Sequence, residues 1–111
     1  MTGPRTLRSL STPRQRLVRL LQSINYGRLE QLLVRDGEPV FEPPPCIRRE
    51  VVFGKANSPN PAKRMEDFVL KEHLVELFEL FDQQRSVTID SLVVQDGLPV
   101  RMSVLEIARV A

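Results

Sequence analysis

Residues 32–40 read Leu-Leu-Val-Arg-Asp-Gly-Glu-Pro-Val, and residues 92–100 read Leu-Val-Val-Gln-Asp-Gly-Leu-Pro-Val. The two stretches lie 60 positions apart. The correspondence continues upstream without a gap, because Leu17, Leu20 and Leu21 match Leu77, Leu80 and Phe81. A repeat at a fixed spacing indicates that one structural unit occurs twice. It predicts an architecture but names no reaction or ligand.

Each copy predicts a helix followed by a β-hairpin. The Asp-Gly pairs at 36–37 and 96–97 suit two-residue type I′ turns, in which both central residues need positive φ. The expected strands are residues 28–34, 39–42, 87–94 and 98–105. A further extended segment is expected over residues 47–53, where β-branched and aromatic residues gather.

Helix signals precede both hairpins. Thr12 is expected to cap the first helix, with Pro13 in its first turn and Gln15 completing a capping box. Asn25-Tyr26-Gly27 is expected to end it. The second helix is expected to begin at residue 61 or 65 and to end at Gln84. Its apolar stripe comprises Met65, Phe68, Val69, Leu74, Leu77, Phe78 and Phe81.

These elements predict an α+β fold: two αββ repeats form a four-stranded antiparallel sheet with two helices on one face, a two-layer sandwich. Prolines lack an amide donor, so Pro39 and Pro99 favour strands 28–34 and 87–94 as the central pair. The repeats are expected to meet about a pseudo-twofold axis. The expected organisation is a flexible tail over 1–11, then one domain over 12–111 with repeats 12–53 and 61–111 and a loop near 54–60.

Composition indicates a soluble domain outside the membrane, with 41% hydrophobic and 27% charged residues and a net charge of +2. No apolar run approaches the roughly 20 residues that a membrane span needs. The single cysteine, Cys46, cannot form an internal disulfide, which fits a cytoplasmic location. The charge is unevenly placed, because the first helix is basic and the second is acidic.

The strands break the alternation expected of a sheet with one solvated face, just before both Asp-Gly turns. Strand twist or a bulge is one explanation. Association is the other, with a second copy of the chain, as a homodimer, covering the second face. The interface would then comprise Leu32, Val34, Phe41, Leu92, Val94 and Leu105. The face toward the helices would carry Val87, Ile89, Val93, Leu98, Val100, Met102 and Val104.

Catalytic and metal-binding patterns are missing from the sequence. His73 is the single histidine and has no neighbours at metal-ligand spacing. Arg48 and Arg49 follow Cys46 closely and could lower the pKa of its thiol, but a small residue packed at a strand start is the preferred explanation. We therefore expect no catalytic residues, no metal and no cofactor, and a protein that is not an enzyme.

The basic first helix suggests an alternative function. Arg14, Arg16 and Arg19 could contact the phosphate backbone of a nucleic acid. A solvated helix face, or a charge match with the acidic second helix, explains the same residues.

The stretch Leu20-Leu21-Gln22-Ser23-Ile24-Asn25-Tyr26-Gly27-Arg28-Leu29, followed by a strand and Asp36-Gly37, resembles the small bacterial YezD-like family of unknown function. The resemblance is close over about residues 14–50 and looser over 74–104, where Ser86-Val87 replaces Tyr-Gly. It implies a tandem version of that unit and supplies no functional residues. The sequence as a whole predicts a non-enzymatic module that acts through homo-oligomerisation and protein–protein contact, with nucleic-acid binding as the alternative.

Overall fold

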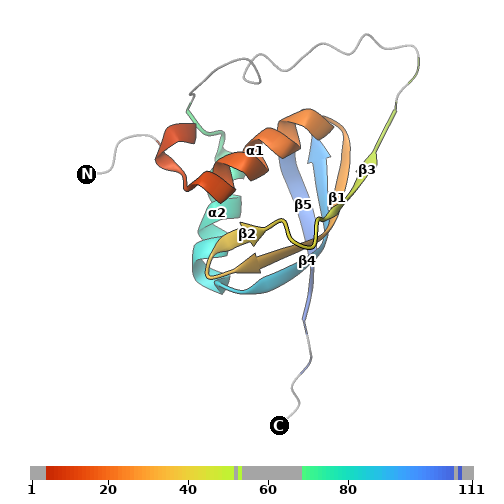
Figure 1. Ribbon diagram of the computed structural model, residues 1–111. Helices are drawn as coiled ribbons and strands as arrows, with labels where there is room; N and C mark the ends of the chain where they lie inside the picture. Colours follow the sequence, from red (N-terminus) through yellow and green to blue (C-terminus); the bar gives the residue numbers. More distant parts are fainter. Residues whose placement is uncertain (1–4, 52, 54–68, 107, 109–111) are drawn as a thin grey trace.

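The computed structural model describes residues 5–51, 53, 69–106 and 108, which form a mixed α+β fold of two α-helices and a five-stranded antiparallel sheet (Figure 1). The elements, in chain order, are the 3₁₀ helix η1 (Leu7–Ser9), α1 (Thr12–Ile24), β1 (Gly27–Arg35), β2 (Glu38–Val40), β3 (Cys46–Arg49), α2 (Glu72–Gln84), β4 (Val87–Gln95) and β5 (Leu98–Leu105).

Helix α1 begins one residue earlier than its capping signal predicts. The N-cap is Ser11, whose hydroxyl accepts a hydrogen bond from the amide of Arg14 at 3.4 Å. Thr12, the expected cap, is the first helical residue, and Pro13 follows in the first turn. The side chain of Gln15 donates to the carbonyl of Leu10 at 2.9 Å instead of closing a capping box. Either hydroxyl can cap a helix, so the sequence alone does not choose between them.

Helix α2 is shorter at its start than expected. It begins at Glu72, after the N-cap Lys71. Val69, expected in the helix, is 59% exposed and forms an isolated antiparallel bridge with Thr6. The expected positions Met65 and Phe68 lie outside the described residues. The remaining stripe is buried as predicted, through Leu74, Leu77, Phe78 and Phe81.

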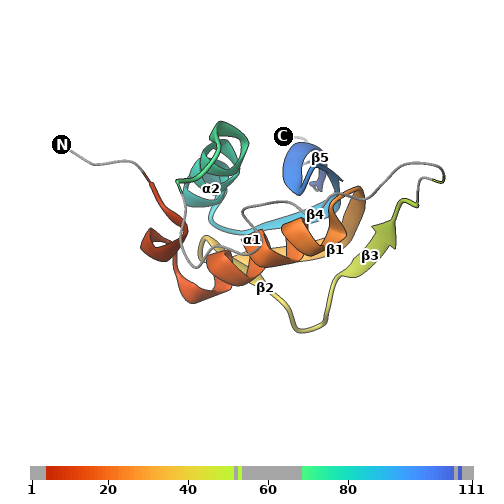
Figure 2. The same ribbon diagram turned by 90° about the horizontal axis from the view of Figure 1, so that it is seen from above.

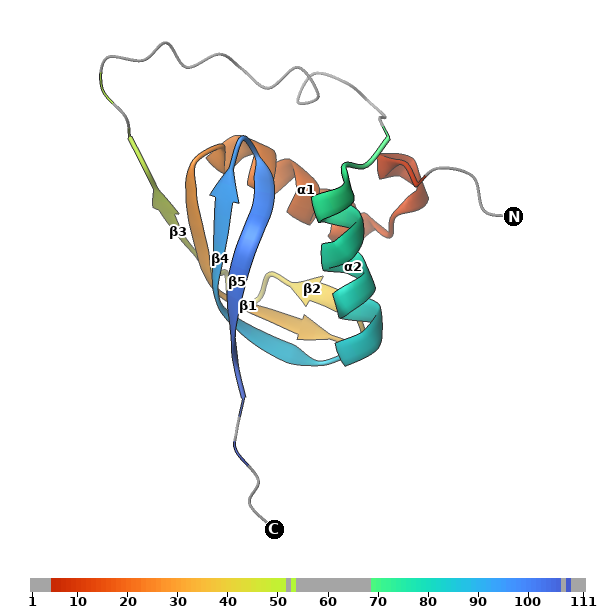
Figure 3. The same ribbon diagram turned by 180° about the vertical axis from the view of Figure 1, so that it is seen from behind.

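The segment expected to be the end of a flexible tail is packed from residue 5 onward. The amide of Leu70 donates to the carbonyl of Arg5 at 2.9 Å. Leu7 in η1 is 2% exposed and belongs to the core. One buried leucine holds a short 3₁₀ turn that carries no periodic signal, and Figure 3 shows η1 beside the first turns of both helices.

The two hairpin turns have the predicted backbone. Asp36 and Gly37 have φ of 53° and 77°, and Asp96 and Gly97 have φ of 54° and 73°. Positive φ at both central residues defines a type I′ turn.

The sheet has the order β2-β1-β4-β5, which confirms β1 and β4 as the central pair. The fifth strand, β3, was not among the four expected in the sheet and pairs with the first half of β1. A Cβ added at Gly27 would lie 2.0 Å from the carbonyl oxygen of Arg48, so glycine permits this close approach. β3 lies at the opposite side of the molecule from α2 (Figure 2).

The pairing of β1 with β4 follows the 60-residue repeat. For each of the following pairs, replacing both residues by their counterparts 60 positions away gives another pair of the same two strands. Gly27 lies opposite Val94, and their counterparts 60 positions away, Val87 and Val34, lie opposite each other. The same exchange relates the pair Arg28–Val93 to Thr88–Leu33, and the pair Leu29–Leu92 to Ile89–Leu32.

The end of each helix contacts the turn of the hairpin that follows the other helix. The C-cap residues Asn25 and Arg85 have φ of 63° and 61°. The amide of Gly97 donates to the carbonyl of Asn25 at 3.0 Å, and the amide of Gly37 donates to the carbonyl of Arg85 at 2.6 Å. Each helix end is thus bonded to the turn of the other hairpin.

A bulge in each central strand changes which residues of the apolar runs face the helices. Gln31 has φ of 59°, and the pairing of β4 with β5 shifts register between Ile89 and Ser91. The extra residue makes Leu29 and Leu32 point to the same face although they are three positions apart, and both are fully buried. Two residues expected to face the helices are not buried: Val93 is half-buried, and Val100 is 36% exposed.

Candidate functional site

The six residues predicted to form an oligomer interface do not share an exposed face. Leu32, Val34, Leu92 and Val94 are at most 1% exposed and belong to the core that both helices cover. Their expected place on an open face is therefore corrected, because the bulges turn them inward. Phe41 is half-buried against the core, and Leu105 alone is strongly exposed, at 65%.

The outer face of the sheet, the one the helices leave uncovered, is crossed by arginines. Arg48 lies opposite Arg28, Arg28 lies opposite Val93, and Val93 lies opposite Arg101. All three arginines are exposed, and Arg48 is 2.5 Å from the carboxylate of Glu30. Removing guanidinium groups from water is costly even where a carboxylate is near, so this face is poorly suited to packing flat against a second sheet.

The edge of β5 offers a different kind of surface. β5 pairs with β4 along one side, and no strand among the described residues pairs with its other side (Figure 3). Two of its large apolar side chains, Val100 and Leu105, are exposed. The opposite edge of the sheet is divided between the short strands β2 and β3.

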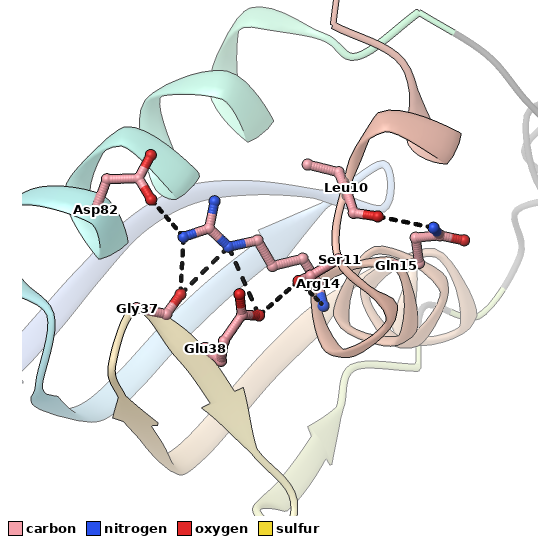
Figure 4. A network of polar contacts seen from close by, with 7 residues as sticks. All are labelled: Leu10, Ser11, Arg14, Gln15, Gly37, Glu38 and Asp82. Carbon is pink, nitrogen blue, oxygen red and sulfur yellow. Dashed lines mark hydrogen bonds and ion pairs between the residues drawn. The ribbon is translucent and has the colours of Figure 1, made fainter.

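Arg14, proposed as a nucleic-acid contact, is held inside a polar network (Figure 4). Its Nη2 donates to the carbonyl of Gly37 at 2.8 Å and to Asp82 at 2.6 Å, and its Nε donates to the same carbonyl at 3.2 Å. Its guanidinium also lies 5.3 Å from the ring centroid of Phe78. The side chain is only 12% exposed, so Arg14 joins α1, the first turn and α2 instead of facing a ligand.

Arg16 and Arg19 line an open groove of about 630 Å³ beside η1 and α1. The guanidinium of Arg16 lies over the ring of Phe41, 4.9 Å from its centroid. Arg19 donates to the side-chain oxygen of Gln22 at 3.0 Å. The rest of the lining is mostly apolar, from Leu7, Leu20 and Phe41, with Thr12 and Gln15 as polar members. No local sequence pattern links Phe41 to the first helix, so this groove was not predicted.

The two residues weighed for chemistry are both at the surface. His73 is exposed on α2. Cys46 is a free, exposed thiol at the start of β3, not the packed small residue that was preferred. Among the described residues no group of three or more His, Cys, Asp or Glu side chains could hold a metal ion.

One tyrosine has a perturbed pKa. The Tyr26 hydroxyl donates a short hydrogen bond to the carboxylate of Asp96. This hydrogen bond, with smaller contributions from desolvation and the carboxylate charge, raises the pKa of Tyr26 above its ordinary value. The contact fastens the end of α1 to the β4–β5 turn.

Comparison with known proteins gives no match to a family model, to a curated protein or to a solved structure. Within the described part of the chain, no helix is both long and apolar enough to cross a membrane.

Proposed function

We propose that this chain is a non-catalytic association module, which forms a symmetric dimer when the free edges of two β5 strands pair. The observation that supports this proposal is the unpaired edge of an eight-residue strand. An edge of this kind presents backbone N–H and C=O groups to any strand that can align with it. A second copy aligned antiparallel meets the requirement of a closed twofold contact, because each chain then offers the same surface.

The devices by which proteins prevent strand pairing are confined to the first half of this edge. Pro99, the register shift beside Val100, and Arg101, the one charged residue of the strand, all lie there, and residues 102–105 carry no proline or charge. The other edge is better protected, because β2 has three residues with Pro39 at its centre and β3 carries Arg48 and Arg49. Short strands, proline and charge are the usual protections of a sheet edge. The difference between the edges favours β5 as the contact.

The expected affinity is moderate. Pairing two strands of this length exchanges about eight backbone hydrogen bonds, each with a net contribution of about 1 kcal/mol. Lost freedom of motion opposes association by about 4–15 kcal/mol. The backbone alone therefore gives a weak dimer, and contacts of Val100 and Leu105 with the second copy must add to it.

We also propose that the fold consists of two copies of one αββ unit, related by a pseudo-twofold axis. The exchange of strand partners 60 positions apart supports it. So do the crossed hydrogen bonds from Gly37 to Arg85 and from Gly97 to Asn25. A tandem version of the YezD-like unit would have this arrangement. Nucleic-acid binding, the alternative, would rest on Arg16 and Arg19, because Arg14 is engaged within the fold.

The test is the mass of the protein in solution. Sedimentation velocity from low to several hundred micromolar protein should show a monomer that converts to a dimer. The double variant Ser103→Lys/Leu105→Lys places two new charges on each β5, both at exposed positions. Like charges meeting across a strand pair are unfavourable, so this variant should stay monomeric over the same range.

The matched control is Gln83→Lys/Gln84→Lys, which adds the same charge at exposed positions on α2. It should dimerise like the original chain, and both variants should retain the original circular dichroism spectrum. A chain that remains monomeric at several hundred micromolar overturns the proposal, as does a dimer that both double variants weaken equally.

A further inference from the structure

The groove beside α1 combines an apolar floor with positive charge. Leu20 and Phe41 are both partly buried and pack against the core, so they form a fixed apolar surface. Two guanidinium groups, of Arg16 and Arg19, belong to the lining, and none of its described residues carries a carboxylate. Binding sites typically have this composition, a mostly apolar lining with a few placed polar groups.

We propose that this groove binds a short acidic segment of a partner protein, with an apolar side chain of that segment against Leu20 and Phe41 and a neighbouring carboxylate at Arg16 and Arg19. The assignment of an acidic ligand rests on charge complementarity. Guanidinium groups bind carboxylates through paired N–H donors, and these bonds are stronger than those between neutral groups. None of the groove residues belongs to β5, so the site does not depend on dimer formation.

The position of Arg16 suits it to this role. Its guanidinium is stacked on the ring of Phe41, at 4.9 Å from the centroid, which restrains a side chain that is otherwise exposed. A stacked guanidinium keeps its N–H donors in the plane of the group, where they remain able to reach a carboxylate. Stacking thus orients the cation in advance and lowers the entropy lost on binding.

The same stack disfavours a single-stranded nucleic acid. Bases bind such proteins by stacking on open aromatic faces along a basic channel. Phe41 is the one aromatic residue among the described residues of the lining, and Arg16 already lies over its ring. Nucleic-acid interfaces are also more polar and more positively charged than this lining.

An open groove suits a chain segment better than an enclosed small molecule. Pockets for small ligands bury most of the ligand surface. This groove remains open, so a peptide can enter and leave along it. The side chain of Gln15 can accept a hydrogen bond from the peptide backbone. Its Nε2 donates to the carbonyl of Leu10, and within the described residues its Oε1 accepts no hydrogen bond.

Fluorescence anisotropy tests the proposal with the full chain at low salt. The probe is the labelled peptide Gly-Glu-Leu-Asp-Phe-Glu-Gly, and its comparison is the amide counterpart Gly-Gln-Leu-Asn-Phe-Gln-Gly. The acidic peptide should bind about tenfold more tightly, because each lost carboxylate removes a charge-assisted contact. Arg16→Gln should weaken its binding about fivefold or more, and Arg19→Gln should act in the same direction.

The control variant is Arg28→Gln, which removes the same charge from the exposed sheet face and should leave binding unchanged. Equal weakening by Arg28→Gln and Arg16→Gln would reveal a general charge effect and overturn the site. Equal binding of the two peptides would also overturn it. An oligothymidine of about 12 nucleotides serves as a competitor. If it bound more tightly than the acidic peptide and lost affinity in Arg16→Gln, the groove would be assigned to nucleic acid instead.

Discussion

The guanidinium of Arg14 connects three elements that are distant in the sequence. It donates to Gly37 in the first turn and to Asp82 in α2, while its own residue lies in α1. Its side chain is 12% exposed, so water replaces these contacts poorly. Glu38 reinforces the same corner by accepting from the Ser11 hydroxyl at 2.5 Å. The planar fork of an arginine fits this set of acceptors, and a lysine does not.

Arg14→Lys should therefore lower the free energy of unfolding by about 1.5–3 kcal/mol, the contribution of hydrogen bonds to charged groups. Urea denaturation followed by circular dichroism measures this change. The control is Arg28→Lys, the same change of side chain at an exposed position, which should stay within about 0.5 kcal/mol of the original chain. Equal effects at both positions would show that Arg14 has no special structural role.

Tyr26 allows a direct measurement at one residue, because it is the only tyrosine and the chain has no tryptophan. Its neutral hydroxyl donates to Asp96, and ionisation removes the donor and places two negative charges together. The folded-state pKa is therefore raised above the unfolded value of about 10. The stability from this contact is present below pH 10 and is lost as the pH rises through the folded-state pKa.

An absorbance titration of tyrosinate should give a midpoint above that of the urea-unfolded chain. Asp96→Asn removes the carboxylate charge while it keeps a residue that tolerates the positive φ of the turn, so it should move the midpoint back toward 10. Asp36→Asn changes the corresponding position of the other turn and should leave the midpoint where it was. A midpoint that Asp96→Asn does not lower would contradict the assigned cause.

At the scale of elements, the bulges decide which side chains reach the core. Helical stripes and Asp-Gly turns were predictable, because their periods and φ requirements are local. The bulges carry no such local signal, so the apolar runs before each turn were assigned to a second buried face. Gln31 has positive φ without the glycine or asparagine that usually announces it. The groove was not predictable either, because its floor joins Leu20 to Phe41 across the fold.

The bulge at Gln31 can be tested with a substitution whose expected effect on stability is the opposite of the one predicted from strand propensity. Valine is favoured in strands, but β-branched side chains are strongly disfavoured at positive φ. Gln31→Val should therefore destabilise the protein by about 1–2 kcal/mol in urea denaturation, although the position is exposed. Gln95→Val, the same change at an exposed position in β4, should stay within about 0.5 kcal/mol. If valine were tolerated equally at both positions, the bulge would not constrain residue 31.

At the scale of the whole molecule, the two halves share one core. Leu17, Leu21 and Leu29 from the first half belong to the same buried cluster as Phe78, Phe81 and Ile89 from the second. The central strand pair, β1 with β4, also takes one strand from each half. A separate half would expose its buried face and keep an incomplete sheet.

Neither fragment 1–60 nor fragment 61–111 should therefore fold as a monomer. Each alone should melt without a cooperative transition in far-ultraviolet circular dichroism, and an equimolar mixture should recover one. The intact chain provides the reference spectrum and melting curve. A cooperative, monomeric transition in either fragment would show that the halves have independent cores.

The unequal edges of the sheet have a consequence for the size of any assembly. A sheet with two open edges can add chains at both ends and grow into a fibre, the hazard that accompanies strand pairing. Here the short strands β2 and β3 form one edge, which Pro39 and two arginines protect, and β5 forms the other. If two chains pair through β5, as we propose, each leaves its protected β2–β3 edge exposed, and we expect growth to stop at two chains. In that arrangement β3 would help to limit the size of the assembly through its position at the protected edge, without binding anything itself.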